Sequence, residues 1–178
     1  MRVRVTAFVI AAVLAGAGLA TAAGRSSHGH ATCAHQSRAG FPGAYTSSRN
    51  LVVGPLVLVD GRVYSPPEIV RRVGGQKYPA LVSPGHTVKI ALSRRARRTH
   101  ALTYADSLHS ARRLDDGLRV VTFHACARRT AQSDAGGRAV TFWSGFILAS
   151  TPRCLHLKIW IDGASEPRRA RIPIGRRC

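Results

Sequence analysis

The chain has 178 residues, and its 27 Lys and Arg against 8 Asp and Glu give a formal net charge of +19. Hydrophobic residues make up 45% of the chain, which excludes an intrinsically disordered protein and is enough for one core. The length excludes a large multidomain enzyme.

The N-terminal segment has the features of a secretory signal peptide. Arg2 and Arg4 precede an almost unbroken apolar stretch over residues 7–20, and Ala20-Thr21-Ala22 is a cleavage signal of the A-x-A type. We expect residues 1–22 to be removed on secretion, which leaves no transmembrane segment. A signal anchor that stays in the membrane is the alternative.

The next segment, residues 23–50, is rich in His, Arg, Gly and Ser and has no periodicity. It is expected to form a flexible or loosely docked arm. Regular structure should begin at residue 51 and continue through one domain, residues 51–178. The first part of this domain, residues 51–59, is an apolar run that Gly54-Pro55 interrupts, which is typical of a bulged or edge strand.

One short helix is expected after this strand. The motif Ser65-Pro66-Pro67-Glu68 is typical of a helix start, with Ser65 as the cap and Glu68 closing a capping box. Gly74-Gly75 should end the helix after about two turns. Its apolar face consists of Ile69, Val70 and Val73.

The rest of the domain alternates between apolar and polar residues with period two, which is typical of strands. The expected strands cover residues 78–82, 87–92, 101–104, 119–126, 139–148, 155–161 and 170–174. Seven or eight short strands separated by turn signals predict an all-β, antiparallel, immunoglobulin-like β-sandwich. A small β-barrel is the alternative.

Three segments carry a resemblance to other proteins. These segments are Asn50-Leu51-Val52-Val53-Gly54-Pro55-Leu56, Phe142-Trp143-Ser144-Gly145-Phe146 and the C-terminal Gly175-Arg176-Arg177-Cys178. In these the chain resembles a group of uncharacterised secreted proteins from high-GC actinobacteria, over most of residues 50–178. The resemblance implies a secreted β domain with disulfides, and it implies no activity and no functional residue.

Four cysteines follow the predicted signal peptide, and an even count in a secreted chain predicts two disulfides. A zinc site is the alternative, but the shortest spacing between cysteines is 24 residues, too long for a ligand pair of the C-x2-C type. A hairpin of residues 154–162 and 168–174 would bring Cys154 beside the end of the chain. This favours the pairs Cys154–Cys178 and Cys33–Cys126. The pairing of Cys126 with Cys154 and of Cys33 with Cys178 stays open.

The sequence contains no clear catalytic motif. Ser144 lacks the first glycine of G-x-S-x-G, and the few acidic residues lie in expected turns and loops. We therefore expect no enzyme and no cofactor. Weak metal binding is an alternative only for the N-terminal arm, through His28, His30 and His35. His124 and His156 are expected on the polar sides of their strands, as surface residues, and a shared site is the alternative.

The arginines are the strongest functional signal. They occur in pairs, and guanidinium groups bind phosphate and carboxylate in a bidentate manner. If consecutive strands are neighbours, loops 93–100 and 127–138 and the turn at 163–167 share one end of the sandwich. The predicted anion-binding residues at that end are Arg94, Arg95, Arg97, Arg98, Arg128, Arg129, Arg168 and Arg169.

This charge predicts a secreted, extracellular or cell-wall-associated binding module for an anionic envelope polymer or surface. Extracellular nucleic acid is a further expected partner, bound without specificity. The basic pairs are not interleaved with the aromatic residues that a dedicated single-strand binding surface needs. A structural or protein-interaction domain with no charged ligand is the alternative. The sequence does not indicate an oligomeric state.

Overall fold

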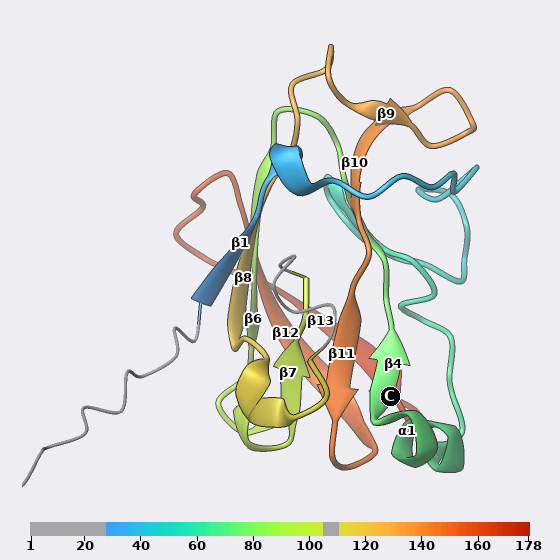
Figure 1. Ribbon diagram of the computed structural model, residues 1–178, viewed down its shortest axis with the longest axis vertical. Helices are drawn as coiled ribbons and strands as arrows, with labels where there is room; N and C mark the ends of the chain where they lie inside the picture. The colour runs from blue at the N-terminus through green and yellow to red at the C-terminus, as the bar shows by residue number, and fades with distance from the viewer. Residues whose placement is uncertain (1–27, 105–110) are drawn as a thin grey trace, which may run out of the picture.

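The computed structural model describes residues 28–104 and 111–178 (Figure 1). The signal peptide expected over residues 1–22 lies outside the described residues. Strands are the main regular elements of the described chain, which also has one α-helix and a few short 3-10 helices. The strands form two five-stranded sheets and one three-stranded sheet, and none of the three closes into a barrel within the described residues.

The first sheet has the strand order β1-β8-β6-β12-β13. Its strands are β1 (His28–Ala31), β8 (Val120–His124), β6 (Thr87–Leu92), β12 (Arg153–Ile161) and β13 (Arg168–Ile174). All neighbouring pairs are antiparallel except β1 and β8, which are parallel. The hairpin expected from β12 and β13 is present, with Arg153 opposite Ile174 and Ile159 opposite Arg168.

The second sheet has the order β2-β3-β5-β10-β9, and the third has the order β4-β11-β7. The second consists of β2 (Leu51–Val53), β3 (Leu56–Leu58), β5 (Ala80–Val82), β10 (Ala139–Trp143) and β9 (Gln132–Ser133). The third consists of β4 (Gly75–Lys77), β11 (Phe146–Ala149) and β7 (His100–Leu102).

The single strand expected over residues 139–148 is divided between two sheets. The chain leaves β10 at Trp143 and enters β11 at Phe146. Gly145 lies at the crossing, where a Cβ atom would overlap the ring of Tyr104. The close approach of that ring explains why glycine stands there.

The helix α1 (Pro67–Val73) lies where the sequence predicts it. Gly74 ends it in the left-handed conformation (φ 75°), and its N–H donates to the carbonyl of Val70. The expected cap is wrong, because Pro66 occupies the N-cap position and no side chain caps the helix. Of the expected apolar face only Val70 is buried, whereas Ile69 and Val73 are exposed.

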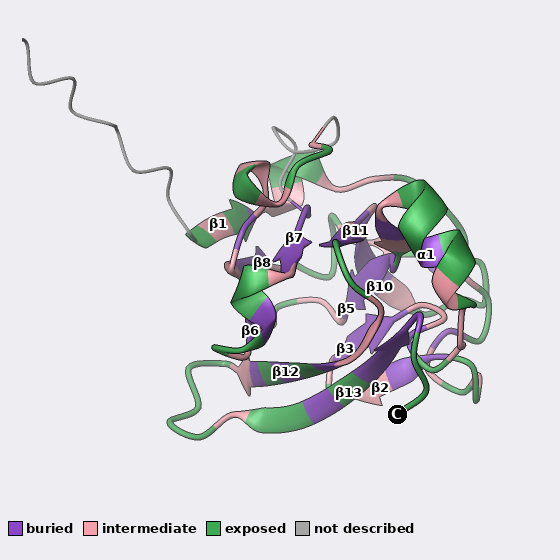
Figure 2. Ribbon diagram, turned by 90° about the horizontal axis from the view of Figure 1, so that it is seen from below, coloured by how far each residue is buried: buried purple, intermediate pink, exposed green. Residues whose placement is uncertain are grey.

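The main core lies between the sheets (Figure 2). Its largest buried side chains form a chain of ring contacts, with the ring centroid of Phe123 5.1 Å from that of Tyr104 and 5.2 Å from that of Trp143. The inward residues of β12 alternate with exposed ones, as the sequence predicts. The all-β sandwich is thus confirmed.

Residues 28–50 differ from the expected loose arm. Residues 28–31 form β1 on the edge of the first sheet, followed by the 3-10 helix η1 (Cys33–His35). The indole Nε1 of Trp143 donates to the carbonyl of Thr32 at 3.0 Å, so the segment is tied to the core. Sequence periodicity misses this segment, because contacts with distant residues hold it.

Both disulfides favoured by the sequence are present. Cys33 is bonded to Cys126 and Cys154 to Cys178, and no cysteine is free. The first bond attaches the segment after β1 to the end of β8. The second attaches the C-terminal residue to the start of β12. The pairing confirms the hairpin from which it was inferred.

Candidate anion-binding groove

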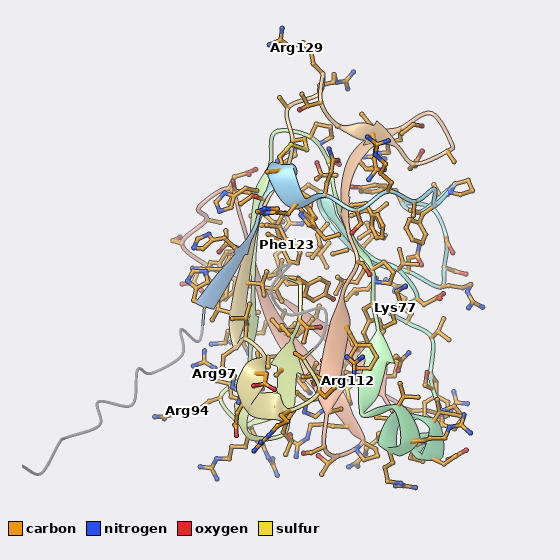
Figure 3. The ribbon with its side chains drawn as sticks, in the orientation of Figure 1. Lys77, Arg94, Arg97, Arg112, Phe123 and Arg129 are labelled. Atoms are coloured by element: carbon orange, nitrogen blue, oxygen red, sulfur yellow. A yellow bond between two sulfur atoms is a disulfide. The ribbon has the colours of Figure 1, made fainter. Side chains whose placement is uncertain are left out.

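The structure separates the arginines that the sequence places together. Arg94 and Arg97 lie near one end of the molecule and Arg129 lies at the other (Figure 3). The expectation that loops 93–100 and 127–138 share an end is therefore wrong. A single site cannot contain both groups.

The short strand β7 is the reason for this difference. The expected tracing counts it as a neighbour of β6 that reverses the chain within one sheet. In the structure β7 pairs with β11 in the third sheet, and β8 then returns to the first sheet beside β6. Because β8 is antiparallel to β6, the loop after β6 and the loop after β8 lie at opposite ends.

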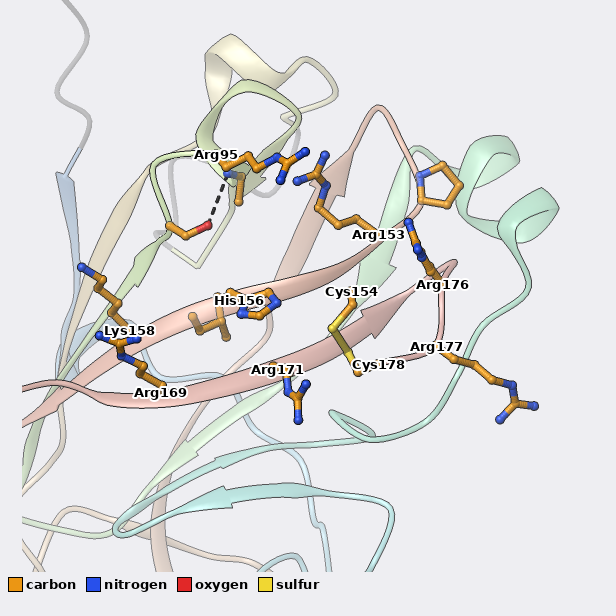
Figure 4. Close-up of a pocket in the computed structure, with 14 residues that line it drawn as sticks. Arg95, Arg153, Cys154, His156, Lys158, Arg169, Arg171, Arg176, Arg177 and Cys178 are labelled. Carbon is orange, nitrogen blue, oxygen red and sulfur yellow. Dashed lines mark hydrogen bonds between the residues drawn. A yellow bond between two sulfur atoms is a disulfide. The ribbon is translucent and has the colours of Figure 1, made fainter.

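A groove of about 840 Å³ lies on the outer face of β12 and β13 and continues toward the loop after β6 (Figure 4). Its charged side chains are all cationic. They are Arg95, Arg153, Lys158, Arg169, Arg171, Arg176 and Arg177. His156 lies between them, and the described residues that line the groove include no Asp or Glu.

The hairpin register places these charges on one face. Along β12 the residues Leu155, Leu157 and Ile159 are buried, so the intervening His156 and Lys158 are exposed (Figure 2). Lys158 is directly opposite Arg169 and His156 is opposite Arg171. Like charges directly opposite each other destabilise an antiparallel pair, so the pair of Lys158 and Arg169 repels.

The other end of the groove is built by the second disulfide. Cys154–Cys178 holds the C-terminal segment over the start of β12, which brings Arg176 close to Arg153 (Figure 4). The guanidinium of Arg177 lies over the ring of Tyr64 at 4.7 Å from its centroid. These arginines are therefore placed by covalent and packing contacts.

Arg95 reaches the groove from the turn that leads into the 3-10 helix η2 (Ala96–Arg98). The backbone N–H of Ala96 donates to the Oγ of Ser93 at 3.4 Å, which closes this turn (Figure 4). The other arginines of the loop do not line the groove. Arg97 instead donates from Nε to the carbonyl of Leu92.

Three acidic residues of the described chain have partners outside the groove. Asp60 forms an ion pair with Arg49 at 2.9 Å, and Asp162 accepts from His86 at 2.7 Å. Asp134 is buried and accepts backbone N–H groups of its own turn. Within the described residues, no groove cation forms an ion pair with an Asp or Glu side chain.

The remaining predicted residues lie outside the groove. Arg128 lines a second cavity of about 650 Å³, together with Arg138 and His86. Arg138 lies over the ring of Tyr45, 3.7 Å from the centroid. Arg129 is exposed, and Arg168 lies at the start of β13. Of the eight predicted residues the groove contains only Arg95 and Arg169.

Five groove cations are absent from the predicted site: Arg153, Lys158, Arg171, Arg176 and Arg177. The alternation in β12 and the Arg-x-Arg spacing of Arg169 and Arg171 were visible signals for part of this set. The sequence does not indicate that no other described segment packs over this face of the hairpin.

The three histidines proposed as weak metal ligands do not form one metal-binding group within the described residues. His28 and His30 lie on β1, whereas His35 lies in η1, where its Nδ1 bonds the Oγ1 of Thr32 at 3.1 Å. Within residues 28–104 and 111–178, no three His, Cys, Asp or Glu side chains form a group suited to a metal ion. His124 lies beside His30, a contact that spacing along the chain does not indicate.

Comparison of the chain with protein-family models, curated proteins and solved structures finds no match. The resemblance to actinobacterial secreted proteins therefore stays a prediction. Within the part of the chain that the structure describes, no helix has the length and apolar character needed to cross a membrane.

Proposed function

We propose that the protein is a non-enzymatic, extracellular binding module that holds an anionic envelope polymer in the groove on β12 and β13. The observation that carries the proposal is the set of seven cations in one groove with no acidic residue among them. Two disulfides are typical of an oxidising, extracellular compartment and support this location.

The shape of the groove favours a polymer over a small anion. Between Arg153 and Lys158 the strand advances about 17 Å, at a rise of about 3.3–3.4 Å per residue. Several phosphate or carboxylate groups of one chain can therefore contact the groove at once. Guanidinium groups suit both kinds of anion because they donate two parallel hydrogen bonds.

Among the described residues that line the groove there is no Phe, Tyr or Trp, and its one aromatic ring is the imidazole of His156. Stacking of bases on aromatic rings is the usual basis of single-strand nucleic acid binding. Extracellular nucleic acid is thus proposed only as a non-specific ligand, and a phosphate-containing wall polymer as the principal one. A structural or protein-interaction domain with no charged ligand is the competing function.

The test compares two variants that remove the same charge. Arg169→Thr/Arg171→Thr removes two groove cations from exposed strand positions, where threonine suits the strand. Arg128→Thr/Arg129→Thr removes two exposed cations at the opposite end and serves as the matched control. Binding to purified teichoic acid is measured over a series of salt concentrations.

Each lost phosphate contact reduces the slope of log K against log salt by about 0.7–0.9, so the groove variant should lose about 1.5 from the slope. The control variant should keep the wild-type slope. Equal changes in both variants would show that only net charge matters. Binding of neither wild type nor control to any wall polymer would favour the structural alternative.

A further inference from the structure

Histidines gather at the edge of the first sheet farthest from the groove. In the parallel pair of β1 and β8, His30 is in register with Thr122, two residues before His124. The Nδ1 of His30 and the Nε2 of His124 are 3.0 Å apart. The strand order puts β8, β6 and β12 between β1 and β13, so this cluster is separate from the basic hairpin.

The surroundings hold both rings in place. The ring of His30 stacks on His28 with centroids 4.8 Å apart, and on His124 with centroids 5.3 Å apart. The Nε2 of His28 is 2.9 Å from the Oγ1 of Thr122, so this ring is itself anchored to β8. Cys33–Cys126 fixes the chain just beyond β1. The two nitrogens therefore come from two strands that are covalently tied.

The separation of the two nitrogens suits a metal ion. At present one ring donates an N–H and the other accepts it, which requires at least one neutral imidazole. With metal–nitrogen bonds of about 2.0–2.1 Å, ligands at a right angle are about 2.9 Å apart and tetrahedral ligands about 3.3–3.4 Å. The observed 3.0 Å is closer to the right-angled arrangement typical of Cu²⁺.

One cation of the neighbouring strand β6 lies against an aromatic ring. The ammonium of Lys89 lies over the ring of Trp160, 4.4 Å from its centroid. The lysine charge is thus partly satisfied by an aromatic face on β12.

We propose that His30 and His124 bind one Cu²⁺ ion, with water in the remaining coordination positions and His28 packed against the ring of His30. This site goes beyond the proposed polymer binding and uses none of its residues. A metal there displaces the shared proton and joins β1 to β8 through two coordinate bonds. It differs from the expected set of His28, His30 and His35, because His30 is the one ligand that the two sets share and His124 is the second.

The test uses the secreted chain, treated with a chelator and titrated with CuSO₄ in a non-coordinating buffer at about pH 7.5, above the usual imidazole pKa. Calorimetry and electron paramagnetic resonance should show one Cu²⁺ per chain with hyperfine coupling to imidazole nitrogen. Zn²⁺ should bind more weakly, as the Irving–Williams order requires.

Three variants decide the outcome. His30→Gln retains a polar side chain but removes the ligand, and it should weaken Cu²⁺ binding about tenfold or more, as should His124→Gln. His156→Gln removes an exposed histidine of the same sheet face and should leave the titration unchanged. Circular dichroism of each variant confirms that it is folded.

The double variant His30→Gln/His124→Gln must lose the nitrogen-coupled signal and the increase in Tm that Cu²⁺ gives the wild type. Wild-type affinity and signal in this variant would overturn the proposal, because copper would then be bound elsewhere, for example by the chain terminus. Absence of Cu²⁺ binding by the wild type would overturn it as well.

Discussion

His100, the first residue of β7, should make the stability of the protein fall steeply in mild acid. Its side chain is fully buried, and its Nδ1 bonds the Oγ1 of Thr99 at 2.9 Å. Its Nε2 has no hydrogen-bond partner within the described residues. The pKa of His100 is lowered from 6.5 to about 4, first by burial and second by the charge of Arg153, while the backbone at Ala96 opposes the shift.

Because this pKa is lowered in the folded chain, the free energy of unfolding falls as the pH falls. The unfolded chain takes up a proton at this residue near pH 6.5, whereas the folded chain does so only near pH 4. The contribution of neutral His100 to the free energy of unfolding is therefore complete above about pH 6.5 and is lost as the pH falls toward about 4. Between about pH 7 and pH 5 the loss is about 2 kcal/mol in the free energy of unfolding.

The measurement is urea unfolding at these two pH values with the disulfides intact. His100→Asn keeps a polar group for Thr99 and cannot become charged, so its stability should fall by about 2 kcal/mol less than that of the wild type. His156→Gln, at an exposed position, should fall as the wild type does. An equal fall in His100→Asn and the wild type would refute the reasoning.

Three further changes should have measurable effects. Replacement of Cys33 and Cys126 by alanine should cost about 5 kcal/mol in urea unfolding, because this bond closes a loop of 93 residues. Phe123→Ala, in the centre of the ring contacts, should cost about 3–5 kcal/mol in the same assay. The pKa of Asp162 is lowered by the backbone N–H of Thr87 and by His86. His86→Ala should raise it toward its usual range, as NMR titration of the carboxyl group can show, and an unchanged value would contradict the role of His86.

Local chemistry in the sequence determined the parts of this fold that depend on neighbouring residues. The helix at residues 67–73 follows from its prolines and its terminal glycine, which act within one or two turns. The hairpin of β12 and β13 follows from strict alternation on both sides of a short turn. Because register in such a hairpin is set by turn and alternation, the Cys154–Cys178 bond could also be inferred.

The tertiary structure alone decided where β7 and residues 28–50 lie. Three residues of β7 have no pattern that selects one sheet over another, so their pairing with β11 depends on packing of the whole core. That choice sends loops 93–100 and 127–138 to opposite ends. Residues 28–50 dock through Cys126 and Trp143, which are about a hundred positions away along the chain.

The groove illustrates the same division. Alternation in the sequence shows that Lys158 and Arg171 point away from the core, since Leu157 and Ile172 point into it. It does not show whether another layer covers them, because coverage depends on the path of every other segment. The described residues leave that face open, and Cys154–Cys178 holds the C-terminal arginines beside it. The number of basic residues is set by the sequence. Their gathering in one groove depends on packing between segments that are far apart along the chain.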